Sequence, residues 1–266
     1  MPIIRVFPRR TKATPEDNTV YIGDPPFLRP EADECHVSVT FTWDIAEGKR
    51  LRDAWSNFYP TLLGGPAFGM SGEFEPGRYL KLGYTITSRG CPHKCWFCYV
   101  PKREGKITEL EIRVGNIVLD NNLTACSLAH RERVFAMLRK QKAVEFAGGL
   151  EASRIDDWWI ENLKALSLNQ LFIAYDQPGS ARSSRRAIER LLKAGLPRRK
   201  VRCFVLSGYP NDTTEKAGER CQEVWAWGAM PFMMLYRDDQ GKEPGQAWKD
   251  LGRKWMRPAA MFASNP

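Results

Sequence analysis

Three of the seven cysteines in this chain fall within the short segment GCPHKCWFCYVP, residues 90–101. Cys91, Cys95 and Cys98 have the spacing C-x3-C-x2-C. Cysteine thiolates are soft ligands that prefer zinc, copper(I) or the irons of an iron-sulfur cluster. A structural zinc site takes four protein ligands, and this segment offers three. The other cysteines are scattered singly, and we expect them to be small buried hydrophobic residues: Cys35, Cys126, Cys203 and Cys221.

Three thiolates suit a [4Fe-4S] cluster with one iron left for a ligand that is not protein, because such a cube normally takes four thiolates. The segment CPHKCWFC, with Phe97 before the last cysteine, resembles the signature of the radical S-adenosylmethionine (radical SAM) superfamily. The resemblance implies that the open iron binds SAM. It also implies that SAM is cleaved reductively to a 5′-deoxyadenosyl radical, which abstracts hydrogen from a substrate. An external flavodoxin-like or ferredoxin-like protein would supply the electron.

Repeated β-α units must position this loop, because apolar runs alternate with amphipathic segments from residue 79 onward. The predicted strands span residues 79–88, 111–119, 143–147, 170–175, 201–206 and 230–236. The predicted helices span residues 125–141, 156–166, 183–194, 213–227 and 246–256. Six units in about 190 residues fall short of the eight strands of a closed barrel. We therefore predict an α/β fold with a partial, open (β/α)6 TIM-like barrel, whose C-terminal mouth carries the cysteine loop.

Residues 1–78 are less regular. Residues 36–43 alternate as a strand, residues 45–59 have the pattern of a helix, and residues 61–66 form a second strand that ends in a glycine turn. We expect a small β-α-β unit here, packed on the edge of a barrel that occupies residues 79–266. The segment LLGGPAF before the barrel is similar to the junction in cobalamin-dependent and methylthiotransferase-type radical SAM enzymes. Cobalamin itself is not expected, because no Asp-x-His-x-x-Gly motif is present.

The same resemblance implies SAM contacts at successive strand ends. Asp120, Asn121 and Asn122 follow the second strand, where relatives bind the SAM amino group, although the usual Gly-Gly-Glu form is absent. Arg154 suits a bidentate hold on the methionine carboxylate, with an ordinary surface loop as the alternative. Asp176 is placed to accept hydrogen bonds from ribose hydroxyls. The full expected set of cofactor-binding residues is Phe97, Asp120, Asn121, Asn122, Glu151, Arg154, Asp176, Ser207, Met234 and Tyr236.

The net charge of +9 favours an anionic partner such as a nucleic acid or a phosphorylated small molecule. The basic stretch at residues 180–202 is interpreted first as the solvated face of a surface helix. No apolar run approaches the roughly 20 residues of a membrane span, so we expect no membrane contact. The odd number of cysteines and the lack of an export signal favour a cytoplasmic protein with reduced or metal-bound thiols.

Two functional classes stay open from the sequence. The first is a radical SAM enzyme whose substrate is unidentified and could be a nucleotide or a nucleic-acid base. The second is a non-catalytic metal- or iron-sulfur-binding module that binds nucleic acid. Catalytic residues are not assigned, and Tyr175, Tyr209, Cys126 or an external donor could quench the product.

Overall fold

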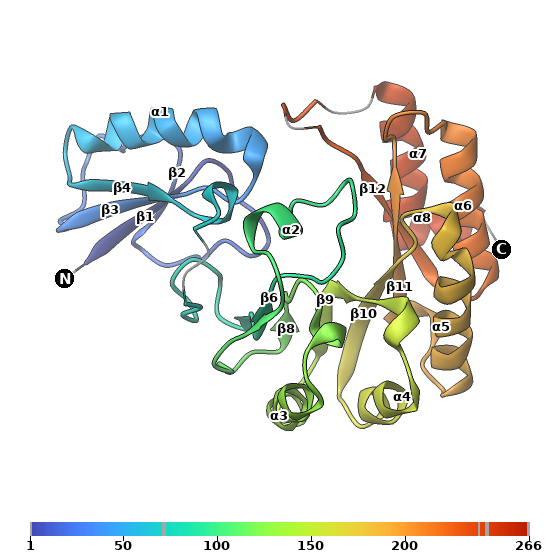
Figure 1. Ribbon diagram of the computed structural model, residues 1–266. Helices are drawn as coiled ribbons and strands as arrows, with labels where there is room; N and C mark the ends of the chain where they lie inside the picture. Colours follow the sequence, from blue (N-terminus) through green and yellow to red (C-terminus); the bar gives the residue numbers. More distant parts are fainter. Residues whose placement is uncertain (1, 71–72, 239, 243–244, 265–266) are drawn as a thin grey trace.

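The computed structural model describes residues 2–70, 73–238, 240–242 and 245–264 of an α/β protein (Figure 1). All neighbouring strands in its two larger sheets are parallel. None of the described helices is both long and apolar enough to cross a bilayer.

The larger sheet contains six strands, whose spatial order is the same as their order in the sequence. The strands are β5 (Tyr84–Thr85), β8 (Ile117–Val118), β9 (Val144–Leu150), β10 (Leu168–Ala174), β11 (Val201–Ser207) and β12 (Met230–Leu235). Each lies within or overlaps one of the six predicted strands. Parallel neighbours need crossover connections, and helices provide most of them here. The helices that follow the larger sheet's strands are α3 (Leu128–Leu138), α4 (Asp157–Lys164), α5 (Ala181–Lys193), α6 (Thr214–Ala226) and α7 (Gln246–Met256).

The first two of these strands are much shorter than predicted. Gly83 has a φ of +96°, a left-handed conformation that ends the extended backbone before Tyr84. On the other side, the backbone N–H of Thr87 donates to the Asp120 carboxylate at 2.6 Å, so it is not available to a neighbouring strand. The first predicted helix is also shorter. The hydroxyl group of Ser127 accepts from the backbone N–H of His130 at 3.2 Å and sets the helix start at Leu128.

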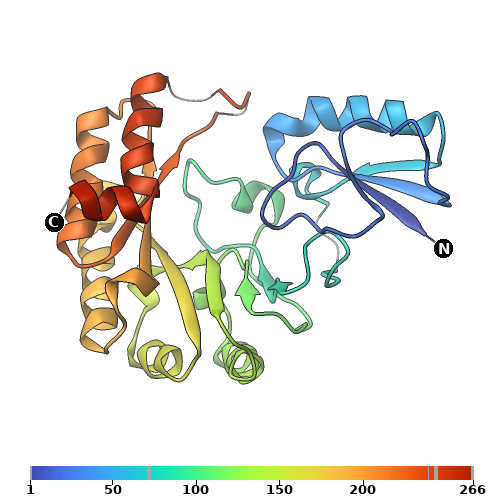
Figure 2. The same cartoon turned by 180° about the vertical axis from the view of Figure 1, so that it is seen from behind.

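The helices pack on one face of the larger sheet and form its main core with the inward-facing strand residues (Figures 1 and 2). On β11, Val201, Cys203 and Val205 are fully buried in this core. The alternate residues of the strands face the other side of the sheet, as the two-residue period of a strand requires. There Phe172 stacks on Phe204, with ring centroids 4.4 Å apart. The face opposite the helices therefore carries a cluster of aromatic rings from Phe172, Phe204 and Phe232.

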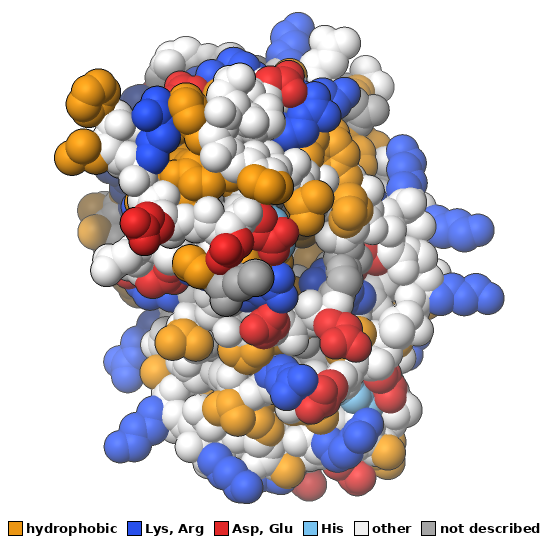
Figure 3. All heavy atoms as spheres, turned by 90° about the vertical axis from the view of Figure 1, so that its left-hand side faces the viewer, with side chains coloured by type: hydrophobic (Ala, Val, Ile, Leu, Met, Phe, Trp, Pro, Cys, Tyr) orange, Lys and Arg blue, Asp and Glu red, His pale blue; other side chains and the backbone are white. Residues whose placement is uncertain are grey.

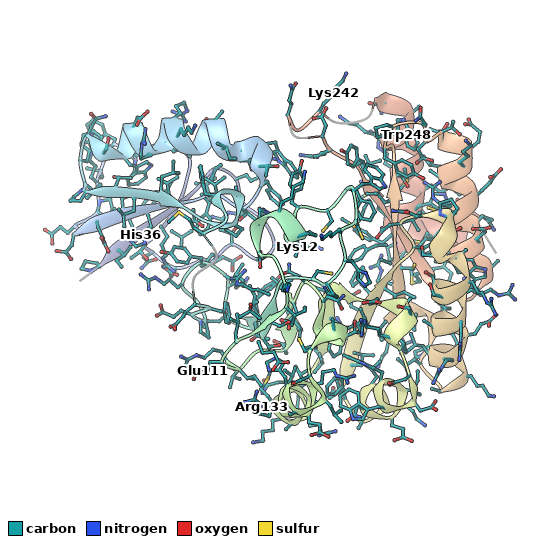
Figure 4. The ribbon with its side chains drawn as sticks, in the orientation of Figure 1. Lys12, His36, Glu111, Arg133, Lys242 and Trp248 are labelled. Atoms are coloured by element: carbon teal, nitrogen blue, oxygen red, sulfur yellow. The ribbon has the colours of Figure 1, made fainter. Side chains whose placement is uncertain are left out.

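Helix α7 completes the core. Trp255 is 2% exposed within the core, and Trp248, labelled in Figure 4, packs against it from the same helix. This confirms the predicted helix, and its seven-residue tryptophan spacing places both rings on the core side. Helix α8 (Pro258–Ser264) follows and buries Met261.

The N-terminal part forms a separate four-stranded sheet with its own buried cluster. Its strands, in the spatial order β2-β1-β3-β4, are β1 (Ile3–Phe7), β2 (Val20–Ile22), β3 (Glu34–Ser38) and β4 (Thr61–Gly64), and its helix is α1 (Ile45–Ser56). Strand β3, helix α1 and strand β4 overlap the ranges in which a strand, a helix and a second strand were predicted. Strands β1 and β2 were not predicted, because β1 is a short apolar run interrupted by Arg5. The boundary near residue 78 stays a prediction.

The remaining elements are short. Strands β6 (Ser88–Arg89) and β7 (Thr108–Glu109) pair antiparallel on either side of the cysteine loop and of α2 (Val100–Arg103). Single 3-10 turns are η1 (Thr42–Asp44), η2 (Pro66–Phe68), η3 (Leu123–Ala125), η4 (Ala152–Arg154), η5 (Pro178–Ser180) and η6 (Arg198–Lys200). The first of these shortens the strand predicted over residues 36–43, which ends at Ser38. In Figure 4, His36 of β3 and Trp248 of α7 lie on opposite sides of the cysteine loop.

Candidate functional site

The cysteine loop connects β6 to α2 and is anchored at its first residue. Gly90 has a φ of +82°, and a Cβ atom there would lie 2.1 Å from the carbonyl oxygen of Lys106. Only glycine fits this close approach of two backbone segments. The backbone N–H of Cys91 then donates to the Gly105 carbonyl at 3.0 Å. The loop is therefore closed at its base, and the three cysteines lie in the part that projects from it.

The three thiols share one region of the loop. Cys91 and Cys98 are partly buried, and Cys95 is exposed. Burial raises the pKa of Cys95, and the neighbouring thiols of Cys98 and Cys91 raise it further. Burial also raises the pKa of Cys98, with a further contribution from Cys91. Charges affect a thiol pKa in this way over short separations, so the thiols of Cys95 and Cys98 both lie near that of Cys91.

The donor set fits an iron-sulfur cluster, although its convergence on one centre is not observed. Three soft, partly accessible thiols on one loop are the ligands that such clusters use. A bound metal cation would also reverse the raised thiol pKa values, because it stabilises the thiolate form. Within the described part of the chain, no three His, Cys, Asp or Glu side chains are arranged to hold a metal ion. Ligation by Cys91, Cys95 and Cys98 stays a prediction.

Asn122 joins the loop to the strand ends of the larger sheet. Its Nδ2 atom lies 3.5 Å from the Sγ atom of Cys91 and donates to Oε2 of Glu151 at 2.9 Å. Its Oδ1 atom accepts a hydrogen bond from the hydroxyl group of Thr124. Both ends of the Asn122 side-chain amide therefore have partners. The oxygen accepts from Thr124, and the N–H groups face the Cys91 sulfur and the Glu151 carboxylate.

The carboxylate of Glu151 contacts four polar side chains near the loop. Besides the bond from Asn122, its carboxylate accepts from Arg154 Nε at 2.9 Å, lies 2.9 Å from His93 Nε2, and accepts from Ser153 Oγ at 2.6 Å. Burial alone would raise its pKa, but hydrogen bonds from Asn122, Ser153 and His93 outweigh burial and lower the pKa of Glu151 to about 2. The structure therefore brings the predicted residues Asn122, Glu151 and Arg154 together beside Cys91.

Asp120 and Asn121 contact the residues that lead into the cysteine loop. Asp120 is 2% exposed, and its carboxylate accepts from Thr87 Oγ1 and Ser88 Oγ, each at 2.6 Å. Asn121 Oδ1 accepts from the backbone N–H of Gly90 at 2.9 Å. These contacts hold the segment that enters the cysteine loop. Their proposed contacts with SAM stay predictions, and for Asp120 the geometry favours a role in holding this segment.

Aromatic side chains connect the loop to the ends of β11 and β12. The ring of Trp96 lies 5.6 Å from that of Tyr209, 5.7 Å from that of Tyr236, and 5.4 Å from that of Phe97. The expected residues Phe97 and Tyr236 are thus neighbours through Trp96. Sequence reasoning assigned no role to Trp96 or His93, although both lie inside the cysteine motif. Their position between the cysteines was the available signal.

The remaining expected residues differ in exposure. Burial raises the pKa of Asp176 to about 6, and its charge acts on the thiols of Cys95 and Cys98, so it lies near the loop. Ser207 is fully buried and donates to the carbonyl of Val205, whereas Met234 is 43% exposed. The described contacts do not join the side chains of Ser207 and Met234 to the loop. Their roles as SAM contacts stay predictions.

The structure separates the candidates for a quenching residue. Tyr175 is buried and its hydroxyl group donates to Glu223 at 2.8 Å, while Cys126 is 5% exposed in the main core. Tyr209 alone of the three lies against an aromatic side chain of the cysteine loop. The scattered cysteines are all buried, which confirms that prediction: Cys35, Cys126, Cys203 and Cys221.

Comparison of the chain with protein-family models, with curated proteins and with solved structures finds no match. The functional assignment therefore depends on the loop, its contacts and its place on the sheet.

Proposed function

We propose that this protein is a radical SAM enzyme. The observation that carries the proposal is the C-x3-C-x2-C loop that follows the first strand of a parallel sheet whose six strands are in sequential order. The carboxyl ends of parallel strands meet at one edge, and the loops at that edge form the active sites of β-α folds. The sequential order supports the finer proposal of a partial, open (β/α)6 barrel.

In this proposal Cys91, Cys95 and Cys98 hold a [4Fe-4S] cluster. When bound, the cluster and SAM supply the radical chemistry, a reductive cleavage to a 5′-deoxyadenosyl radical that takes hydrogen from an unidentified substrate. The chain positions the ligands. The Asn122 amide N–H faces the Cys91 sulfur, and Asp120 and Asn121 fix the segment that leads into the loop.

The cofactor contacts proposed for SAM use the groups around this loop. Arg154 is the proposed partner of the methionine carboxylate, and Asp176 that of the ribose hydroxyls. The backbone of Met234 and Tyr236 would face the adenine edge. We further propose that the electron comes from a flavodoxin-like or ferredoxin-like protein and that the enzyme works in the cytoplasm, where thiols stay reduced.

The test is anaerobic reconstitution of the whole chain with iron and sulfide, followed by addition of SAM and dithionite. We expect 5′-deoxyadenosine to form. The variants Cys91→Ala, Cys95→Ala and Cys98→Ala should each lose bound iron and this product, because the cluster needs all three thiolates. Cys221→Ala is the matched control, since Cys221 is buried in α6 away from the loop.

The alternative function is a metal- or iron-sulfur-binding module without catalysis that grips nucleic acid. It predicts that a reconstituted protein binds iron but leaves SAM intact, with a cluster spectrum that does not respond to SAM. That result, or a stoichiometric zinc ion in place of iron, would reject the enzyme proposal.

A further inference from the structure

An open groove lies at the edge of the larger sheet that is opposite the carboxyl ends. It has a volume of about 520 Å³ and forms where the chain enters β9, β10 and β11. The residues that line it are Lys142, Ala143, Ser167, Leu168, Asn169, Gln170, Arg199 and Lys200. We call it the basic groove. The cysteine loop is remote from it, because a seven-residue strand such as β10 spans roughly 23 Å.

The basic groove has three cationic side chains, from Lys142, Arg199 and Lys200. Among the described residues, no Asp or Glu forms an ion pair with Lys142, Arg199 or Lys200. Residues 139–202, which form the groove and also extend to the opposite edge of the sheet, carry 14 Lys and Arg against seven Asp and Glu, which accounts for seven of the nine net positive charges. On the neighbouring strand β9, Glu145 is the register partner of Gln170 and is not among the lining residues. A groove with this charge attracts anions.

The groove also offers uncommitted polar groups on a fixed backbone. The side chains of Ser167, Asn169 and Gln170 have no hydrogen-bond partner within the described part of the molecule, so they are free to donate to a ligand. The backbone below them is held, because the Val144 N–H donates to the Ser167 carbonyl at 2.8 Å. Asn116 Nδ2 donates to the carbonyl of Ala143 at 3.1 Å and fixes the turn there.

Two neighbouring arginines, Arg198 and Arg202, are partly buried. The guanidinium of Arg202 lies over the ring of Phe232, 5.1 Å from its centroid, and its buried Nε and Nη2 atoms have no hydrogen-bond partner among the described residues. Arg198 is held against Trp225 at 4.1 Å. These two side chains are fixed by aromatic rings, whereas Lys142, Arg199 and Lys200 remain available at the groove itself.

The types of side chain on this surface indicate which class of partner it can bind. Between residues 129 and 233, no large hydrophobic side chain is exposed in the described structure. A protein partner normally needs apolar or aromatic anchors, and a membrane surface needs apolar side chains that insert. Lys, Arg, amide and hydroxyl groups without such anchors are the groups that contact phosphates and sugars of nucleic acids.

We propose that the basic groove binds the phosphate backbone of a nucleic acid. The groove docks the polyanion and takes no part in chemistry at the cysteine loop. The inference goes beyond the proposed enzymatic function and is independent of it, since binding at this edge needs neither cluster nor SAM.

The test measures fluorescence anisotropy of a labelled single-stranded DNA oligonucleotide, of the RNA with the same sequence and of the DNA duplex. The whole chain should bind at least one of them with a salt-dependent affinity over about 0.05–0.2 M ionic strength. The triple variant Lys142→Gln/Arg199→Gln/Lys200→Gln should raise the dissociation constant about tenfold or more. It should also reduce the slope of log K against log salt by about 2, because three phosphate contacts are lost.

The matched control removes the same charge from the N-terminal part of the chain with Arg10→Gln/Lys49→Gln/Arg52→Gln; Lys49 and Arg52 lie on α1, and Arg10 follows β1. These three side chains are exposed there, and the same part of the molecule shows basic, acidic and hydrophobic side chains interspersed (Figure 3). The control should bind the probe nearly as tightly as the unmodified chain. Equal weakening by both triple variants would overturn the proposal, as would no saturable binding by a folded chain. Preferential binding to vesicles of anionic phospholipid would also overturn it, in favour of a membrane surface.

Discussion

Asp176 and Glu151 are two carboxylates near the cysteine loop whose environments shift their pKa values in opposite directions. Glu151 accepts several hydrogen bonds, and its pKa is lowered to about 2. For Asp176, burial raises the pKa, and a hydrogen bond with the backbone of Leu206 offsets only part of this effect. The pKa of Asp176 is therefore raised to about 6. Two carboxylates whose pKa values are shifted in opposite directions are typical of functional sites. Here Glu151 stays ionised throughout the neutral range, and Asp176 binds its proton at about one pH unit below neutrality.

The raised pKa of Asp176 predicts a specific pH dependence of stability. Its pKa is higher in the folded chain than in the unfolded chain, so the folded state binds more protons between about pH 4 and pH 6. Stability from this group is present below pH 4 and is lost as the pH rises through about 6. The variant Asp176→Asn should lose this dependence, and relative to it the unmodified chain should lose about 1–3 kcal/mol between pH 4 and pH 7.

Urea unfolding of both proteins at these two pH values measures the difference directly. Because all other titrating groups are shared, they cancel in the comparison. Parallel changes in the two proteins would show that Asp176 titrates normally.

The connection between β11 and α6 is held by a buried ion pair. Arg220 donates to the Asp212 carboxylate at 2.8 and 3.0 Å and to the carbonyl of Leu206 at 3.0 Å. Their side chains are 6% and 0% exposed, respectively. Asp212 also accepts from the backbone N–H of Gly208 at 2.9 Å. The pair therefore fixes the loop that carries Tyr209 against Trp96.

Replacing one partner of this pair should be strongly destabilising. Arg220→Leu leaves the Asp212 carboxylate buried without its cation, so we expect a loss of about 3–5 kcal/mol in the free energy of unfolding. Arg185→Leu is the control, because Arg185 pairs with Glu189 on the exposed surface of α5 and should cost less than about 1 kcal/mol.

The double variant Asp212→Asn/Arg220→Leu separates charge from packing. It should recover a substantial part of the lost stability, since no charge is then left buried. If the single and double variants were equally unstable, the loss would come from packing of the arginine stem.

At the scale of the whole molecule, two buried clusters lie under two separate sheets. Hydrogen bonds cross between the two parts of the chain. Arg103 of α2 donates to the carbonyl of Pro66 at 3.1 Å, and the backbone N–H of Lys81 donates to the carbonyl of Ala13 at 2.8 Å. Sheets with separate cores tend to open as separate cooperative units. The predicted division near residue 78 can be tested on this basis.

Matched truncations in the two cores should therefore have local effects. Leu51→Ala and Leu171→Ala each remove a fully buried leucine, one from α1 and one from β10, and each should cost about 2–5 kcal/mol within its own unit. In hydrogen exchange, the first should speed exchange in β1 to β4 and α1, and the second in β9 to β12. If either variant accelerated exchange equally along the whole chain, the molecule would be a single unit.

The longest sequence patterns predicted the structure best. Strands β9 to β12 and helices α4 to α7 lie close to their predicted ranges, because their apolar periodicity is uninterrupted and caps such as Thr213, which accepts from the Lys216 N–H, mark the ends. Strands β5 and β8 were overextended, because the capture of the Thr87 N–H by Asp120 depends on residues 33 positions apart.

The sequence by itself determined the three-cysteine spacing, the β-α alternation and the burial of the single cysteines, because each depends on local residue types and periods. Tertiary structure alone decided that Asn122 faces Cys91. It also decided that the Glu151 carboxylate contacts His93, Ser153 and Arg154. In the same way, it placed three cations around one groove at the opposite edge of the sheet. Each of these arrangements brings together residues from separate loops. The distance between two loops depends on how the strands pair and how the helices pack, and a local sequence pattern does not predict either.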